Sequence, residues 1–230
     1  MKREGLQRTF RRWFSRLPEP QYTRFRNLKL FDWMNQNAPG KRVLNLGSGN
    51  GHFDHYLHKD IKPLHLDISS SVRNLDIIAD AHCLPFKDRC FEVVYSIAVI
   101  EHLKRPWVAM DEIARVLRSG GHVVLEVPFL NVIHAEQDYF RFTDKGIRSL
   151  LDEKRFEIIF EQVDSGGGSF LSVFLLSYSE QFIPTTIMKA FWRVFMRYPF
   201  CLFKYLDLPI NGSRTLRMTA NSFLCIGRKR

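Results

Sequence analysis

The chain has 230 residues, of which 45% are hydrophobic, so it can form one domain with a full core and is not intrinsically disordered. Its four cysteines form no Cys-x-x-Cys pair, which excludes the usual zinc spacings and a disulfide framework and favours a reducing cytoplasm. Residues 1–42 carry 11 Lys and Arg against 3 Asp and Glu, and residues 189–230 carry 9 against 1, so two basic ends flank an acidic centre.

The predicted elements begin with a basic N-terminal arm. It has no apolar run of the kind that a secretory signal needs, so we expect a cytoplasmic protein. Apolar residues at near-helical spacing predict a helix over 21–36 that covers the domain, which divides the chain into residues 1–36 and a main domain over 37–230. Strands then alternate with helices, which favours an α/β fold with a doubly wound parallel sheet. Strands are predicted at 42–46, 63–67, 76–80, 91–97, 122–128, 156–163 and 222–230, and helices at 52–58, 106–118 and 144–152.

A glycine-rich loop follows the first predicted strand. Gly47, Gly49 and Gly51 stand at G-x-G-x-G spacing, which lets the backbone turn tightly and approach a ligand closely. A dinucleotide-binding loop has its third glycine one position later, where this chain has His52. The pattern therefore predicts either a ligand-binding loop of another kind or a purely structural turn between strand and helix.

Two aspartates end the next two predicted strands. Asp67 stands 20 residues after Gly47, where a carboxylate is suited to accept hydrogen bonds from both hydroxyls of a ribose. Asp80 ends the following strand and is suited to accept a hydrogen bond from the amino group of adenine. Either residue alone is equally well explained as a helix cap or turn residue. Together with the glycine loop they would line the crevice at the carboxyl ends of the strands, where open α/β sheets bind ligands.

These segments resemble class I S-adenosylmethionine-dependent methyltransferases of the small-molecule branch. VLNLGSGNG (43–51) resembles their first motif, LHLDIS (64–69) their ribose-binding segment, and IIADAHCLPF (77–86) the D-x-x-x-L-P-F segment at their adenine pocket. The resemblance extends over about residues 40–163 and the last strand. It implies a seven-stranded sheet of order 3-2-1-4-5-7-6, with strand 7 antiparallel.

The resemblance also implies S-adenosylmethionine as the cofactor and assigns residues to it. The glycines would lie near its methionine portion, Asp67 on the ribose and Asp80 with Ala81 at the adenine. Asn45 departs from the family, which usually has an acid there, so we expect weaker cofactor binding or even a domain without turnover. The predicted cofactor-binding set is Asn45, Gly47, Ser48, Gly49, Gly51, Asp67, Ile68, Asp80, Ala81, Ile97 and Ala98.

Candidate catalytic residues follow the fourth and fifth predicted strands. Glu101 and His102 follow the fourth, while His134, Asp138 and Arg141 lie in a polar and aromatic loop over 129–143. The loop resembles a segment of methyltransferases associated with polysaccharide and glycolipid biosynthesis, which implies a polar, sugar-like acceptor. His134 is our choice for the general base, and the chemistry requires no metal, so none is predicted. The structural alternatives are that His102 bonds a backbone carbonyl and that Arg141 pairs with Asp138.

Residues 169–210 are predicted to form a helical, aromatic and basic insertion. No apolar run is long enough to span a bilayer, and Lys189, Arg193 and Arg197 share one stripe of a helix over 184–198. The segment therefore fits a helix on an anionic membrane surface, a roof over the acceptor pocket, or an ordinary amphipathic helix. The basic ends would suit anionic lipid, nucleic acid or a phosphorylated substrate, or form a solvated surface without a partner.

Three functions are compatible with these features. The favoured one is methyl transfer, at oxygen, to a small-molecule, sugar or lipid-linked acceptor. An RNA methyltransferase is the second, suggested by the basic ends, but SIAVIEHL (96–103) stands where an N/D-P-P-Y/F/W segment would be expected and no RNA-binding module is recognisable, so a nucleic-acid partner is disfavoured. The third is an S-adenosylmethionine-binding scaffold without turnover, suggested by Asn45. The oligomeric state does not follow from the sequence.

Overall fold

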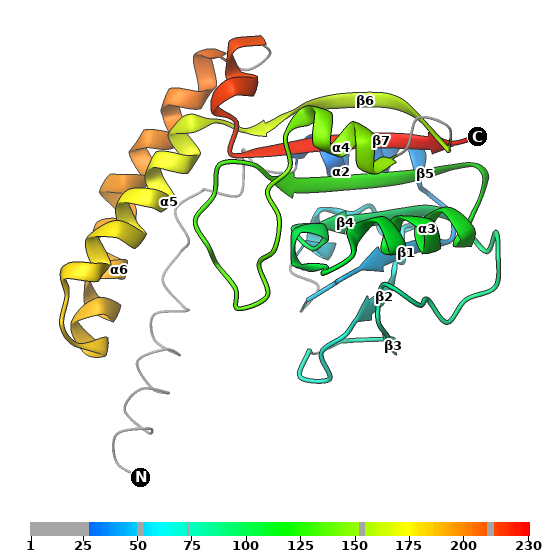
Figure 1. The fold of residues 1–230 in the computed structure, drawn as a ribbon, viewed down its shortest axis with the longest axis horizontal. Helices are drawn as coiled ribbons and strands as arrows, with labels where there is room; N and C mark the ends of the chain where they lie inside the picture. The colour runs from blue at the N-terminus through cyan, green and yellow to red at the C-terminus, as the bar shows by residue number, and fades with distance from the viewer. Residues whose placement is uncertain (1–27, 50–52, 73, 152–154, 211–213) are drawn as a thin grey trace.

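The computed structural model describes residues 28–49, 53–72, 74–151, 155–210 and 214–230, so the predicted basic arm and Gly51 lie outside the described residues. Its sheet has seven strands in the order β3-β2-β1-β4-β5-β7-β6 (Figure 1). The first five strands are parallel, and β7 is antiparallel to both of its neighbours, which confirms the predicted order and direction. The strands are β1 (Val43–Leu46), β2 (Leu64–Asp67), β3 (Ile77–Ile78), β4 (Phe91–Ile97), β5 (Leu117–Pro128), β6 (Phe156–Ser165) and β7 (Ser222–Lys229).

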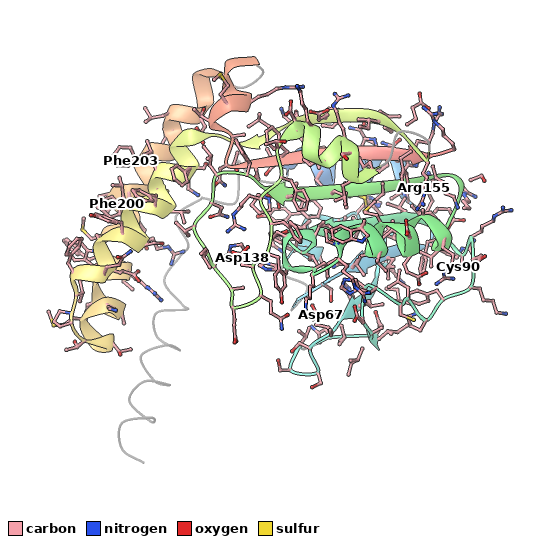
Figure 2. All side chains as sticks on the ribbon, viewed as in Figure 1. Asp67, Cys90, Asp138, Arg155, Phe200 and Phe203 are labelled. Atoms are coloured by element: carbon pink, nitrogen blue, oxygen red, sulfur yellow. The ribbon has the colours of Figure 1, made fainter. Side chains whose placement is uncertain are left out.

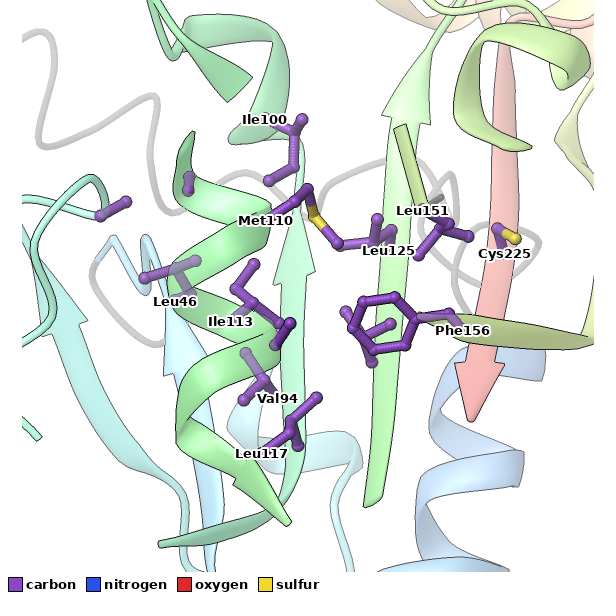
Figure 3. Close-up of a cluster of buried hydrophobic side chains, with 14 of the residues drawn as sticks. Leu46, Val94, Ile100, Met110, Ile113, Leu117, Leu125, Leu151, Phe156 and Cys225 are labelled. Carbon is purple, nitrogen blue, oxygen red and sulfur yellow. The ribbon is translucent and has the colours of Figure 1, made fainter. Parts of the chain in front are cut away.

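Helices bury both faces of the sheet, which is why the central strands are continuous apolar runs. On one face α2 (Leu28–Asn37) packs Phe31 and Met34 against β1 and β4 residues such as Val43. On the other face α3 (Pro106–Val116) and α4 (Asp144–Leu151) pack against the alternate residues of the same strands (Figure 3). This second cluster includes Leu46, Val94, Met110, Ile113 and Leu151. The double-sided core holds the carboxyl ends of β1, β2, β4 and β5 in fixed register at one edge of the sheet.

The helix predicted over 52–58 is wrong for the residues described there. The chain instead forms one 3₁₀ turn, η2 (Asp54–Tyr56). Phe53 and Tyr56 pack on Phe31 of α2, with ring centroids 5.9 Å and 5.4 Å apart. The His58 amide donates to the Asn35 side chain at 2.7 Å, which draws the backbone towards α2 instead of into a further helical turn. Tertiary contacts with α2 therefore override the local helical pattern.

A helical insertion separates β6 from β7, as predicted. It contains α5 (Gly167–Ser179), η4 (Glu180–Phe182), α6 (Thr186–Cys201), η5 (Leu202–Ile210) and η6 (Arg214–Thr219). Asp207 of η5 caps α5, because its carboxylate accepts hydrogen bonds from the Gly168 and Ser169 amides at 2.8 Å and 2.9 Å. The α5–α6 pair stands beside the sheet, on the side where β5 and β6 end (Figure 1). Within the described residues, none of the helices is both long and apolar enough to cross a membrane.

Candidate active site

The glycine loop after β1 is held against the ends of β2 and β4. The Gly47 and Ser48 amides donate to the Leu66 carbonyl at 2.8 Å and 3.0 Å. Gly47 has a φ of 70° and lies so close to the turn after β4 that a Cβ would stand 2.4 Å from Cγ2 of Val99. Gly49 has a φ of 52° and no atom within 4 Å of its Cβ position, so the loop presents bare backbone to open space. The loop therefore suits the close approach of a ligand.

Asp67 lies directly against this loop, as the spacing predicts. Its two carboxylate oxygens accept hydrogen bonds from the Gly49 amide at 3.0 Å and the Ser69 amide at 2.9 Å. The carboxylate thus orders the loop and stands beside the backbone that would carry the cofactor (Figure 2). Ile68, the next residue of the predicted set, exposes its side chain to solvent at the same edge.

Asp80 follows β3 and is bonded to its own turn. Its carboxylate accepts from the His82 amide at 2.9 Å and lies 2.6 Å from Nδ1 of His82. The backbone hydrogen bond from His82 holds the pKa of Asp80 below its ordinary value, so the residue is a carboxylate at neutral pH. Ala81 beside it is buried in the core. A hydrogen bond from the Ala79 amide to the Asp67 carbonyl, 3.0 Å long, keeps the two predicted acidic positions on neighbouring strand ends.

The end of β4 has an unusual backbone conformation. Ala98 has a φ of 51°, in the left-handed region that residues with a Cβ rarely adopt, and its amide donates to the Glu126 carbonyl at 3.0 Å. The preceding Ile97 pairs with Glu126 of β5. Val99 contacts Gly47, so the turn over 97–99 lies against the glycine loop. Such strain is common at functional sites, and here it brings the end of β4 to the predicted cofactor edge.

Asn45 faces β2, where its side-chain nitrogen lies 3.2 Å from Nδ1 of His65. The other ring nitrogen of His65 lies 3.2 Å from the Asp54 carboxylate, which fixes the imidazole with its proton towards Asp54. Nδ1 of His65 then accepts the Asn45 hydrogen bond. The amide nitrogen of Asn45 is thereby engaged with β2, and the side chain is buried at the end of β1.

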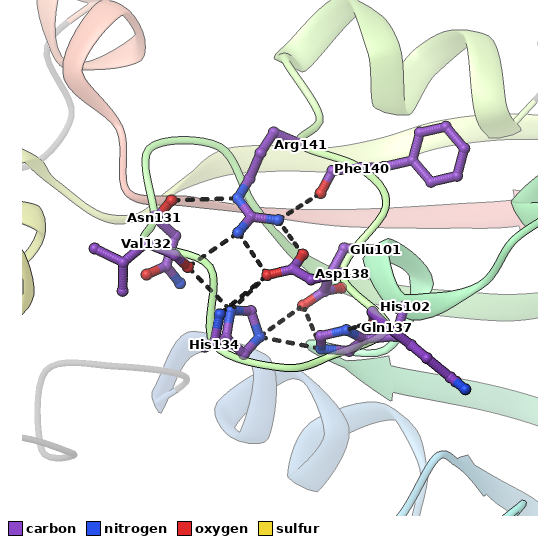
Figure 4. A network of polar contacts seen from close by, with 9 residues as sticks. All are labelled: Glu101, His102, Asn131, Val132, His134, Gln137, Asp138, Phe140 and Arg141. Carbon is purple, nitrogen blue, oxygen red and sulfur yellow. Dashed lines mark hydrogen bonds and ion pairs between the residues drawn. The ribbon is translucent and has the colours of Figure 1, made fainter.

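Arg141 organises the loop after β5. Its guanidinium donates to both carboxylate oxygens of Asp138 and to the Val132 and Phe140 carbonyls, the last two at 3.0 Å and 2.8 Å (Figure 4). The Asp138 side chain is only 1% exposed, and Arg141 lowers its pKa to about 2. Arg141 therefore pairs with Asp138, which is the structural role left open by the sequence.

The loop brings two histidines together over Glu101. The Nε2 atoms of His102 and His134 lie 3.0 Å apart, and they lie 3.7 Å and 3.9 Å from Oε1 of Glu101 (Figure 4). His102 donates from Nδ1 to the Gln137 carbonyl at 2.5 Å, and Nδ1 of His134 lies 3.2 Å from the Asp138 carboxylate. The structure thus joins three of the four predicted catalytic residues into one cluster, with Arg141 behind Asp138.

Glu101 is a candidate that the sequence names from its place after the fourth strand, but its burial in this cluster is not predicted. Its side chain is fully buried, and burial raises the pKa of its carboxyl to about 8. Glutamate is rarely buried in proteins. Glu101 lies in η3 (Ile100–His102), and its backbone carbonyl accepts hydrogen bonds from the Tyr139 and Phe140 amides of the loop after β5. These contacts between distant segments are not encoded in the local sequence. The signal available in the sequence was its place directly before His102, just past the end of a predicted strand.

The comparisons with known proteins agree with this geometry. A family model described as a methyltransferase domain matches residues 44–125. An uncharacterized protein of Methanocaldococcus jannaschii is 33% identical over 150 residues, covering 62% of this chain and 65% of that protein. A fatty-acid O-methyltransferase of Mycolicibacterium smegmatis is 34% identical over 100 residues, covering 37% of this chain and 36% of the enzyme. The chain therefore spans less than two thirds of the length of these relatives.

The fold recurs in solved structures at low sequence identity. The crystal structure of the [4+2]-cyclase SpnF matches with a TM-score of 0.63 and 15% identity, covering 93% of this chain and 84% of that one. This likeness concerns the fold alone. The family match covers the glycine loop, Asp67, Asp80 and the end of β4, which are the elements assembled at one edge of the sheet. Residues 44–125 are therefore similar to a methyltransferase domain, and this similarity, together with the strand order of the sheet, implies S-adenosylmethionine as the cofactor.

Proposed function

We propose that the chain transfers the methyl group of S-adenosylmethionine to a hydroxyl oxygen of a small-molecule, sugar or lipid-linked acceptor. The observation that carries the proposal is the convergence of His102 and His134 on Glu101, just past the ends of β4 and β5. β4 pairs with β1, the strand that precedes the glycine loop. The fatty-acid O-methyltransferase among the relatives adds support for an oxygen of a lipid-like acceptor. The resemblance of the loop over 129–143 to glycolipid-associated enzymes adds support for a sugar.

In this proposal the cofactor supplies an already activated electrophile, the methyl group on its sulfonium. The chain's own residues position the acceptor and take up its proton. Nε2 of His134 is the atom that receives the proton, because its other ring nitrogen faces the Asp138 carboxylate, which stabilises the imidazolium. Arg141 is a positioning residue that holds Asp138 in place. Positioning supplies much of the acceleration, and a general base adds about 10²–10⁴-fold.

Two alternatives remain distinct from this proposal. An RNA methyltransferase would use the basic ends of the chain, whereas a scaffold would bind the cofactor without turnover, and the [4+2]-cyclase shows that this fold is not limited to proteins named as methyltransferases. The test is transfer of a labelled methyl group to a lipid extract, to sugar nucleotides and to total RNA in parallel. We expect label in the lipid or sugar fraction. Label in RNA would support the second function, and no label in any fraction the third.

We propose further that the α5–α6 segment docks reversibly on an anionic membrane surface. Large apolar side chains of η4 and α6 face solvent instead of the sheet, with Phe182 72% and Phe195 76% exposed, and Phe191 and Met188 also exposed. In the predicted basic stripe of Lys189, Arg193 and Arg197, the charge of Arg193 is already balanced within the chain. Its guanidinium donates to both carboxylate oxygens of Glu180, at 2.5 Å and 2.6 Å. The exposed aromatics therefore carry more of the proposal than this arginine does.

Co-sedimentation with vesicles tests the docking surface. We expect binding to anionic and not to neutral vesicles, lost at high salt, because each basic residue near an anionic surface contributes about 1 kcal/mol. The double variant Phe182→Ser and Phe195→Ser should lose most of the binding through loss of apolar insertion. Trp107→Ser is the matched control, since Trp107 is also an exposed aromatic, at 55%, but lies on α3. Absence of binding to either vesicle at low salt would end the proposal.

A further inference from the structure

The two histidines of the cluster cannot both be neutral and stable as they stand. Nδ1 of His102 faces the Gln137 carbonyl, and Nδ1 of His134 faces the Val132 carbonyl and the Asp138 carboxylate, at 3.2 Å each. These partners only accept, so both Nδ1 atoms carry the hydrogen. Each Nε2 of a neutral ring then presents a lone pair, and the two lone pairs face each other across 3.0 Å. A positive charge between them is required to remove this repulsion.

Glu101 adds a third electron-rich group to the same point. Its side chain is fully buried, and neither of its carboxylate oxygens has a hydrogen-bond partner among the described residues. A buried carboxyl group without a partner is costly in its charged form, so native proteins pair such groups, keep them protonated or use them to bind a cation. Oε1 of Glu101 points at the space between the two Nε2 atoms, 3.7 Å and 3.9 Å away (Figure 4).

We propose that Glu101, His102 and His134 bind a divalent transition-metal ion, with Zn²⁺ as the leading candidate. A tetrahedral Zn²⁺ site with bonds of about 2.0–2.2 Å places neighbouring ligand atoms about 3.3–3.6 Å apart. The three ligand pairs here are separated by 3.0, 3.7 and 3.9 Å, so shifts of a few tenths of an ångström form the site. Two imidazoles and one carboxylate leave a fourth position open, as in catalytic zinc sites.

The partners of the ligands match what metal sites need. Histidine ligands usually donate their other ring N–H to a carbonyl or carboxylate, which fixes the tautomer and the direction of the ring. Here the Gln137 carbonyl accepts the Nδ1 hydrogen of His102, and the carboxylate of Asp138, which Arg141 holds in place, faces Nδ1 of His134. The loop over 129–143 is thereby built to aim two nitrogen lone pairs at one point. The rival arrangement is a proton shared in the cluster.

In the proposed function, the ion would activate the hydroxyl group of the acceptor. With its open position at the edge of the cofactor site, it would bind the acceptor oxygen and make the hydroxyl proton more acidic. His134 would then act as a ligand, and the proton would leave to solvent instead of to its ring. This catalytic role rests on the proposed function, whereas the binding of the ion does not.

Cobalt substitution tests the site without any need for turnover. The full chain, stripped with a chelator, is titrated with Co²⁺ while visible absorption and metal content are recorded, and Zn²⁺ is then added in competition. We expect one Co²⁺ per chain, visible bands typical of a low-symmetry nitrogen and oxygen site, and displacement by Zn²⁺. Removing the Asp138 partner in Asp138→Asn should weaken binding by about 10–100-fold. Loss of a ligand in His134→Ala or Glu101→Gln should weaken it at least as much.

His58→Ala is the matched control, because His58 also faces a carboxylate, with Nδ1 3.3 Å from Asp60, but has no third ligand among the described residues. It should bind Co²⁺ like the wild type. Circular dichroism and cofactor titration of each variant show that it is folded. A wild type that binds cofactor but takes up no Co²⁺ or Zn²⁺, or binds them equally well in Glu101→Gln and His134→Ala, overturns the site and favours the shared proton. A chain that binds the metal but no cofactor overturns the proposed function and leaves the site standing.

Discussion

Replacement of Asp67 by alanine is expected to weaken S-adenosylmethionine binding by about 10–150-fold. Lost charge-assisted hydrogen bonds to the ribose correspond to about 1.5–3 kcal/mol. The structure adds a second cause, because the Asp67 carboxylate also accepts the Gly49 and Ser69 amides and so orders the glycine loop. Calorimetric titration of the cofactor into wild type and variant measures the effect.

Two further variants separate these causes. Asp67→Asn keeps an acceptor oxygen for the Gly49 amide but loses the charge, so its cofactor affinity should fall between those of wild type and Asp67→Ala. Asp60→Ala is the control, since Asp60 is an exposed aspartate whose carboxylate faces His58. An affinity of Asp67→Ala within two-fold of the wild type would remove Asp67 from the cofactor site.

Replacement of His134 by alanine is expected to lower methyl transfer by about 10²–10⁴-fold while leaving cofactor affinity within a few-fold. Loss of the imidazole removes the group that takes up the acceptor proton or, as a metal ligand, would help to hold the ion that makes this proton more acidic. His134 belongs to the loop after β5, whereas Asp67 and the glycine loop form the predicted cofactor edge, so the two functions should separate. Turnover is measured with the acceptor fraction that becomes labelled in the wild-type assay, and the cofactor dissociation constant is measured beside it.

Arg141→Ala and Asp138→Asn extend this test to the positioning residues. Removing Arg141 leaves the buried Asp138 carboxylate without its charge partner, which typically costs about 3–5 kcal/mol and should release the loop. Asp138→Asn keeps the shape of the side chain but places a neutral amide, in place of the carboxylate, next to Nδ1 of His134. Both variants should depress turnover with cofactor affinity preserved. Unchanged turnover in all three variants would show that the loop is purely structural.

The strands of this fold are predictable because their signals are local. Leu44 and Leu46 face one helix layer while Val43 faces the other, and a strand buried on both sides must be apolar at every position. The segment over 52–58 is mispredicted because its conformation depends on Phe31 and Asn35, which belong to a helix some twenty residues earlier. Local pattern and tertiary contact disagree there, and the contact prevails.

The candidate site divides in the same way. The glycine loop and Asp67 lie on consecutive strand ends, so their spacing along the chain predicts that they meet. The approach of His134 to His102 joins residues 32 positions apart through a loop whose path depends on the carbonyls that Arg141 gathers. The burial of Glu101 depends on the same loop. No local pattern encodes that path, so the meeting of Glu101, His102 and His134 is visible only in the folded chain.

The most direct test of the central claim is a calorimetric titration of S-adenosylmethionine, and of its demethylated product, into the folded wild-type chain. The arrangement of Gly47, Gly49 and Asp67 at the ends of β1 and β2 predicts saturable binding of one cofactor molecule per chain. Binding should weaken in Asp67→Ala and stay unchanged in Asp60→Ala. Absence of binding of either compound by a chain that circular dichroism shows to be folded would contradict the account.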